Sequence, residues 1–415
     1  MDGRIQKLKD RWRESVLLRN IALLYAEVAL IGILNGTIGV YLGVFAIRLG
    51  ASNNLIGLLS SLPALINVLL MYPASQIVNS WTNKIEINKW SFLFTRILYL
   101  PLALVPYFPN PPIFILIVVT LLAIPASVAN IALNVMFIEL VPSSLRATVV
   151  SNRLMLIMFI QTFFTIVVGY FLDRILFPVN FQIVMFVGFL SSMISLYLMT
   201  LLKPPKKSAL SNKRYPIELS SMWTQFKDIY ILFKRDPHYM KYQLATFIYY
   251  LGLYVPMPLF SIRMVKELRF SNFVVGLTNT SGSLATAISY PYWGRKGKKL
   301  GVKRALFWSN IGISFYPLIF SLLRDSSQIV PFSAVGGFFS AGFSAFMYMA
   351  LLLFLSQDKK AEYLAVNGII TSISLTLGPI LGTQLSRVIG TTPVFFIGTL
   401  IRLIGTYLLL KTIPN

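Results

Sequence analysis

Apolar residues in this chain of 415 residues form long runs that are separated by short polar breaks. A helix needs about 18 or more apolar residues to cross a hydrocarbon core of about 30 Å. Twelve runs meet that length, so we predict an all-α membrane protein. The predicted spans cover 21–47, 55–79, 89–107, 113–140, 150–172, 180–202, 242–262, 273–293, 305–323, 329–355, 364–386 and 392–410.

The composition agrees with a membrane protein. Charged residues make up 12% of the chain and hydrophobic residues 56%, whereas a soluble domain is about a quarter charged. The chain has no cysteine, which excludes disulfides and thiolate metal sites, and its single histidine, His238, cannot by itself build a multi-histidine centre. We therefore expect no metal and no cofactor.

The positive charges predict the orientation of the spans. Cytoplasmic loops retain lysine and arginine, and an inside N-terminus places 28 of the 37 such residues on the cytoplasmic side. Both termini are then cytoplasmic, as expected for a multi-pass protein of the cell membrane. The net charge of +23 would suggest nucleic-acid binding in a soluble chain. Here the cations lie between spans, so we expect anionic lipids, and no nucleic acid, as their partner.

The longest connector divides the spans into two sets of six. Its second part has apolar residues at helical spacing from Leu219 to Phe233, flanked by lysine and arginine, which predicts an amphipathic helix on the inner membrane surface. The predicted parts are a basic N-terminal segment at 1–20, a six-helix bundle at 21–202, a cytoplasmic linker at 203–241, a second six-helix bundle at 242–410 and a tail at 411–415.

An internal repeat relates the two sets of spans. At an offset of 219 residues, Ser52-Asn53-x-x-x-Gly57 pairs with Ser271-Asn272-x-x-x-Gly276, so spans 2 and 8 begin alike. Repeated halves with a site at their interface are the architecture of secondary transporters that alternate access.

Short loop motifs make the family resemblance specific. The segment from Gly294 to Arg304, with Gly301, resembles the major facilitator superfamily loop Gly-x-x-x-Asp-Arg-x-Gly-x-Arg-Arg, although Lys298 stands where the family usually has aspartate. Glu139-x-x-Pro142-x-x-x-Arg146 and Gly378-Pro379-x-x-Gly382 are also similar to family segments. The resemblance implies two pseudo-symmetric bundles of six helices. It also implies a cytoplasmic gate, whose candidates are Glu139, Arg146, Arg153, Gly294, Gly301 and Arg304.

Polar residues within spans normally face the bundle interior or a water-filled cavity. In the family that this chain resembles, spans 1, 4, 7 and 10 line a central cavity, and polar stripes fall on them here. A single serine or threonine can equally bond its own backbone or allow close helix packing. The candidates for the substrate cavity are Asn35, Thr120, Ser127, Asn130, Asn134, Gln243, Thr246, Tyr250, Tyr254, Ser340 and Ser344.

Three charged residues fall well inside spans, away from the span ends: Glu27, Arg96 and Arg402. Desolvation favours the protonated form of a carboxylate, which makes Glu27 a candidate proton-coupling group. The alternative is a structural salt bridge with Arg96, which lies at a similar depth. Arg402 could attract an anionic substrate, but hydrogen bonding between helices is the favoured interpretation because span 12 is usually peripheral in this family.

These features predict a monomeric secondary transporter of a small organic solute, powered by protons or by the solute's own gradient. A nucleotide-binding loop of the Gly-x-x-x-x-Gly-Lys-Ser/Thr type is absent, which argues against direct use of ATP. One alternative is a membrane enzyme such as a lipid-linked group transferase, but the outer acidic residues Asp173, Glu267 and Asp325 are scattered and the chain is not expected to be an enzyme. The other is a receptor or scaffold without transport.

Overall fold

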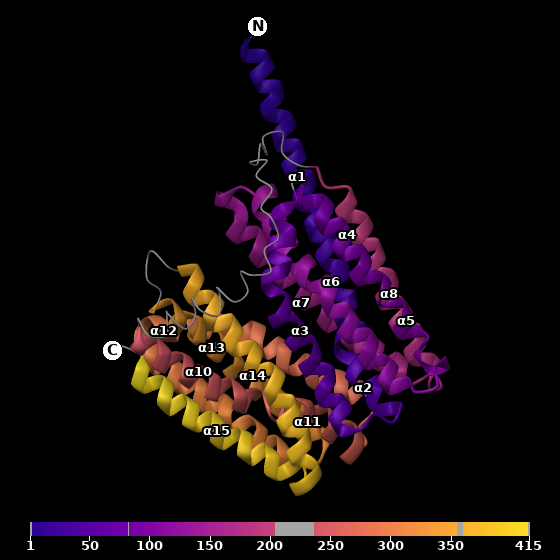
Figure 1. Cartoon of the computed structure of the whole chain (residues 1–415), viewed down its shortest axis with the longest axis vertical. Helices are drawn as coiled ribbons and strands as arrows, with labels where there is room; N and C mark the ends of the chain where they lie inside the picture. Colours follow the sequence, from indigo (N-terminus) through magenta and orange to yellow (C-terminus); the bar gives the residue numbers. More distant parts are fainter. Residues whose placement is uncertain (1, 82, 204–235, 355–359, 414–415) are drawn as a thin grey trace. The chain divides into compact units, whose positions relative to one another are not determined.

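The structure is a computed structural model that describes residues 2–81, 83–203, 236–354 and 360–413, with side chains from residue 16 onward except those of 147 and 360–362. The described chain is helical almost throughout (Figure 1). The amphipathic helix predicted in the linker lies outside the described residues. The elements are α1 (Asp2–Leu34), η1 (Asn35–Gly39), α2 (Val40–Arg48), α3 (Asn53–Ser80), α4 (Lys84–Ile97), α5 (Leu100–Ala103), η2 (Val105–Tyr107), α6 (Pro111–Leu140), α7 (Ser143–Leu172), α8 (Val179–Thr200), α10 (Pro237–Tyr254), α11 (Met257–Ile262), η3 (Arg263–Glu267), α12 (Asn272–Leu322), α13 (Ser326–Leu352), α14 (Lys360–Ile389) and α15 (Thr391–Thr412).

Ten helices in the described part of the chain are long and apolar enough to cross a membrane. The all-α membrane fold predicted from the sequence is therefore confirmed, while the count of twelve spans stays a prediction. The difference arises at two places. The predicted spans 273–293 and 305–323 both fall within α12, which has 51 residues, and the predicted span 89–107 is divided among α4, α5 and η2.

Proline and glycine explain both differences. Pro101 and Pro106 lie in α5 and η2, and proline has no backbone N–H to continue a helix, so this segment breaks into short pieces. Within α12, Gly301 has φ 77° and ψ 164°, a conformation that bends the backbone and that side chains rarely allow. The predicted spans 273–293 and 305–323 are therefore joined through this bend, which lies inside the basic motif from Gly294 to Arg304.

The chain forms two compact units. The first contains Met1–Leu42, Leu69–Val168 and Ile175–Leu219, and the second contains Gly43–Val68, Gly169–Arg174 and Ser220–Asn415. In the first unit α1 packs on α8, and α4 packs on both α6 and α8. The turn η1, which continues α1, also approaches α7 closely, because a Cβ added to Gly36 would lie 2.8 Å from the carbonyl oxygen of Gln161.

The second unit packs α12 on α13, and α10 on α14 and α15. Its core is rich in aromatic side chains, including Tyr242, Tyr249 and Phe346. Gly378, in the Gly-Pro motif of α14, lets this helix approach the end of α10, because a Cβ there would lie 2.6 Å from the Cβ of Tyr254. The motif therefore has a packing role at the break between α10 and α11.

Asp173, at the end of α7, completes the N-terminus of α12 within the second unit. Its Oδ1 accepts from the backbone N–H and the side-chain amide of Asn272, each at 2.8 Å, and its Oδ2 accepts from the N–H of Phe273 at 2.8 Å. The first N–H groups of a helix have no partner within the helix, and the helix dipole favours an anion there. A carboxylate 99 residues away in sequence thus serves as the cap.

Three further hydrogen bonds hold residues 43–68 within the second unit. The Lys266 ammonium donates to the carbonyl oxygen of Ala51 and, at 3.0 Å, to Oδ1 of Asn53. Arg48 donates to the carbonyl oxygen of Phe270 at 2.9 Å. Residues 43–68 and 169–174 are therefore held by charged side chains against the start of α12 and the end of η3.

We expect Asp173→Asn to loosen the docking of residues 43–68 and 169–174 in the second unit. Asparagine carries no charge, and its single side-chain oxygen cannot replace the two oxygens that accept three bonds. A cysteine placed at Ala51, which is 1% exposed, reports the loosening in a chain that has no other cysteine. The rate of maleimide labelling at position 51 should rise several-fold in the Asp173→Asn protein.

Asp325→Asn is the matched control for that experiment. Asp325 precedes α13 in the same unit, but its side chain makes no capping hydrogen bond. The control should label at the rate of the parent protein. Equal labelling of the parent and the Asp173→Asn protein would show that the carboxylate does not hold the two segments together.

Candidate functional site

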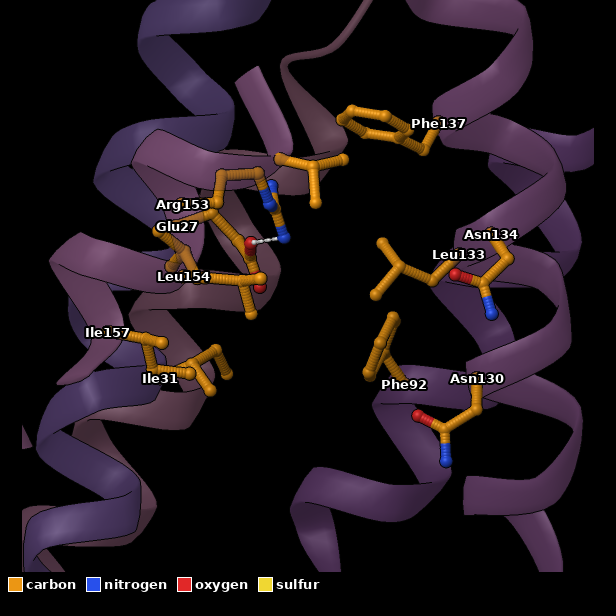
Figure 2. A pocket seen from close by; sticks show the side chains of 12 residues that line it. Glu27, Ile31, Phe92, Asn130, Leu133, Asn134, Phe137, Arg153, Leu154 and Ile157 are labelled. Carbon is orange, nitrogen blue, oxygen red and sulfur yellow. Dashed lines mark hydrogen bonds and ion pairs between the residues drawn. The ribbon is translucent and has the colours of Figure 1, made fainter. Parts of the chain in front are cut away.

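A cavity of about 340 Å³ lies within the first unit, between α1, α4, α6 and α7. Helices α1, α6 and α7 contribute residues three or four positions apart, which is the spacing of one helical face, and α4 contributes Phe92. Figure 2 shows Glu27 and Arg153 on one side of the space, and Asn130 and Asn134 on the other. The lining residues are Glu27, Val28, Ile31, Phe92, Asn130, Leu133, Asn134, Phe137, Val150, Arg153, Leu154 and Ile157.

Glu27 and Arg153 form an ion pair at the cavity wall. The Nη2 of Arg153 lies 3.0 Å from Oε2 of Glu27, and its Nη1 donates to the carbonyl oxygen of Leu24 at 3.0 Å. The hydroxyl of Ser195, on α8, donates to Oε1 of Glu27 at 3.3 Å. Glu27 is 2% exposed, so its charge is stabilised by side chains from other helices and not by water.

Arg96 lies directly behind this wall. Its Nη2 is 3.8 Å from Oε1 of Glu27, which is an ion-pair distance without a hydrogen bond. The guanidinium carbon lies 4.5 Å from the ring centroid of Phe92, a cavity residue. Arg96 is 1% exposed, and neither Nη1 nor Nη2 has a hydrogen-bond partner. The cluster of Glu27, Arg96 and Arg153 therefore has one more positive charge than negative charges.

The contact of Glu27 with Arg96 that was considered from the sequence is present. At 3.8 Å it is longer than the 3.0 Å contact between Glu27 and Arg153. The four cavity candidates predicted on the span that forms α6 divide into two groups. Asn130 and Asn134 line the cavity and are exposed. Thr120 and Ser127 instead donate to carbonyl oxygens of their own helix, at Leu116 and Ala123. Only the two asparagines are placed to meet a solute in this cavity.

Asn35 begins the π-helical turn η1 and does not line the cavity. Such turns widen a helix locally and recur at functional sites. In this chain the turn precedes Val40, the first residue of α2. The role of Asn35 in solute binding stays a prediction.

The remaining cavity candidates belong to the second unit. Gln243 donates to Asn367 at 3.4 Å, while its own Oε1 is buried without a partner. Tyr250 and Tyr254 stack with ring centroids 5.8 Å apart. Two hydroxyls bond the backbone of their own helix: Thr246 donates to Tyr242, and Ser344 donates to Ser340.

The predicted cytoplasmic gate has a different set of contacts. Glu139 lies in the electrostatic field of Lys84, and Arg146 donates to the carbonyl oxygens of Ile138 and Val141 at the end of α6. Arg153 pairs with Glu27 instead. In the second unit, Gly294 and Arg304 lie in α12 on either side of the bend at Gly301. Together these contacts leave a gate role for the six residues as a prediction.

Arg402 donates hydrogen bonds to two backbone carbonyls that lack their usual helical donor because proline stands four residues later. In an α-helix each carbonyl accepts from the N–H four residues later, but Gly252 and Ile313 are followed at that position by Pro256 and Pro317. Arg402 donates to both carbonyls, at 3.1 and 2.9 Å.

The third bond of Arg402 also goes to main chain, since it donates to the carbonyl oxygen of Leu253 at 3.2 Å. The side chain is 2% exposed and joins α10, α12 and α15. Its described hydrogen bonds all go to backbone carbonyls, which supports the interhelical role over attraction of a substrate.

The apolar part of the cavity wall was not predicted from the sequence. Ile31 and Ile157 follow Glu27 and Arg153 by four residues, and Phe137 follows Asn134 by three. That spacing is a usable signal once the polar residue of each helix is known to face the cavity. Arg153 itself was placed in the gate, because its helix face could not be matched to that of Glu27.

Long apolar helices around a cavity that combines apolar walls with an ion pair and two asparagines are typical of membrane solute transporters. The sequence model of the Major Facilitator Superfamily matches residues 24–236 and 243–415. The chain belongs to this superfamily, which confirms the predicted family and the predicted class of secondary transporter. No curated protein matches the sequence significantly.

Solved structures of transporters share the fold. A variant of the nucleoside transporter NupG is 14% identical with a TM-score of 0.71, over 96% of this chain and 100% of that one. A D-xylose–proton symporter is 13% identical with a TM-score of 0.67, over 97% and 98%. A bacterial homolog of the human lysosomal transporter Spinster is 13% identical with a TM-score of 0.66, over 97% of each chain.

We expect Arg402→Met to destabilise the protein by about 1–3 kcal/mol for each carbonyl left unpaired. Restoring an N–H should recover part of that loss, so Pro317→Ala should raise the melting temperature of the Arg402→Met protein more than that of the parent. Pro291→Ala, in the same helix, is the control because Arg402 does not bond the carbonyl four residues before it. Equal effects of Pro317→Ala in both backgrounds would contradict the assigned role.

Proposed function

We propose that the protein moves a small organic solute through the cavity between α1, α4, α6 and α7, and couples this movement to protons at Glu27. The observation that carries the proposal is the position of Glu27. Its buried carboxylate is at the wall of the cavity and is held by Arg153 from another helix. A solute that separates Arg153 from Glu27 changes the electrostatic environment of Glu27, which gives solute binding and proton binding a shared coupling energy.

The lining of the cavity supports an organic solute. Ligand pockets are mostly apolar, with a few polar groups that fix the orientation, and this one combines apolar walls with two asparagines and an ion pair. Its volume of about 340 Å³ is near the lower end of the usual range, which favours a small solute. A nucleoside transporter and a D-xylose–proton symporter share the fold.

Two of the three outer acidic residues, Asp173 and Glu267, have structural partners, which supports transport without catalysis. Asp173 caps α12. Glu267 pairs with Arg263 at 3.0 Å and accepts from the hydroxyl of Thr391 at 2.6 Å. Groups engaged in this way are poorly placed for the acid–base chemistry of a lipid-linked group transferase.

The proposed orientation rests on charge. Cytoplasmic termini in the cell membrane follow from the 28 of 37 lysines and arginines that this orientation places inside. The basic motif from Gly294 to Arg304 would then meet anionic lipid headgroups. The proposed functional unit is the monomer, because the cavity is built by helices of a single chain.

Glu27→Gln tests the coupling, because glutamine keeps the shape of the side chain but binds no proton. A thermal-shift screen of nucleosides, pentoses, hexoses and organic acids first identifies a solute, which is then labelled for proteoliposome assays. We expect solute exchange in counterflow to persist in the Glu27→Gln protein, while accumulation driven by a pH gradient falls at least tenfold.

Glu86→Gln is the matched control, because Glu86 lies on the exposed face at the start of α4. It should leave both assays unchanged. Undiminished gradient-driven accumulation by the Glu27→Gln protein would remove the coupling role, and a lack of counterflow for every solute that binds would contradict transport through this site.

A further inference from the structure

The charges around the cavity are unbalanced in a way that points to a missing anion. Glu27 on α1, Arg96 on α4 and Arg153 on α7 face one another, and together they carry a net positive charge. The other lining residues are two asparagines and apolar side chains. Buried charges are costly unless they are paired and hydrogen-bonded.

The cluster also has too few hydrogen-bond acceptors for its two arginines. One carboxylate is divided between two guanidinium groups: Oε2 of Glu27 bonds Arg153 at 3.0 Å, while Oε1 lies 3.8 Å from Arg96. Arg96 is 1% exposed and has no hydrogen-bond partner at either terminal nitrogen. A second oxyanion would allow each arginine its own acceptor.

We infer that the transported solute carries one oxyanionic group, a carboxylate or a phosphate, that binds Arg153 in place of Glu27. This inference rests on the proposed function, since it treats the cavity as the solute site. It assigns a substrate class that the fold alone does not.

The exposed fractions of the two arginine side chains indicate which of them a solute contacts first. The side chain of Arg153 is 13% exposed and lines the cavity, whereas that of Arg96 is 2% exposed and lies behind Glu27. An anion that enters the cavity therefore meets Arg153 first. Its arrival displaces Glu27 toward Arg96, so that two arginines are paired with two anions. No covalent bond forms or breaks in this exchange.

The other lining residues indicate which chemical groups the remainder of the solute carries. Phe92, Leu133 and Ile157 offer apolar and aromatic surface, and Asn130 and Asn134 present amides opposite the ion pair (Figure 2). Amides donate and accept hydrogen bonds. The expected solute has an oxyanion at one end, a compact apolar body, and a hydroxyl or carbonyl group at the other end.

The test compares paired probes on the purified full-length protein. Benzoate and 4-hydroxybenzoate are compared with benzamide and 4-hydroxybenzamide, which keep the shape but not the charge, and phenyl phosphate distinguishes phosphate from carboxylate recognition. Isothermal titration should show at least tenfold tighter binding of the anions than of the amides. Binding of phenyl phosphate but of neither carboxylate would assign phosphate as the group.

Two variants make the result specific. Arg153→Gln should weaken anion binding at least tenfold, while Arg174→Gln, an exposed arginine at the end of the same helix segment, should not change it. Glu27→Gln should instead tighten anion binding about tenfold, because the competitor for Arg153 is neutralised. Structural damage would not produce that gain.

The outcomes separate this inference from the proposed function. Equal binding of anions and amides, or unchanged anion binding in the Glu27→Gln protein, overturns the inference even if a neutral solute is transported. Anion binding with the expected response to both variants supports the inference, even if proteoliposomes show that no bound anion crosses the membrane, which would count against the proposed function alone.

Discussion

A hydrocarbon core contains no water, so each buried charge and each carbonyl must find its partner within the protein. This constraint determines what the charged side chains of this chain do. Arg402 donates to carbonyls whose usual donors are replaced by Pro256 and Pro317. Glu27 is paired by a side chain from another helix. Each charge thus fixes contacts between segments that are distant in sequence.

The two units meet this constraint in different ways. In the first unit, three charged residues gather beside a cavity and leave one cation in excess. In the second unit, Thr246 on α10 and Ser344 on α13 bond their own helices, and Tyr250 and Tyr254 of the predicted stripe stack on each other. Within the described residues, the first unit therefore has a charged cluster beside its cavity, and the second unit has an aromatic core.

The sequence predicted what depends on the order of residues along one helix. Runs of apolar residues indicated the spans, and the depth of Glu27 and Arg96 in their spans predicted that they would meet. The pair of Glu27 and Arg153 could not be predicted in this way, because it depends on how α1 and α7 are rotated against each other. Close approaches such as that of Gly36 to Gln161 set that rotation. They depend on how two whole helices pack, and the residue pattern of one helix does not determine them.

The cap that Asp173 provides has a consequence for the folding of α12. A helix usually carries the residue that satisfies its own first turn, but here two backbone N–H groups, of Asn272 and Phe273, depend on a carboxylate from the end of α7. The start of α12 is therefore complete only while residues 169–174 are docked against it. Amide hydrogens at these two positions exchange with solvent when the segment leaves, so their isotope exchange measures the separation directly, without any added label.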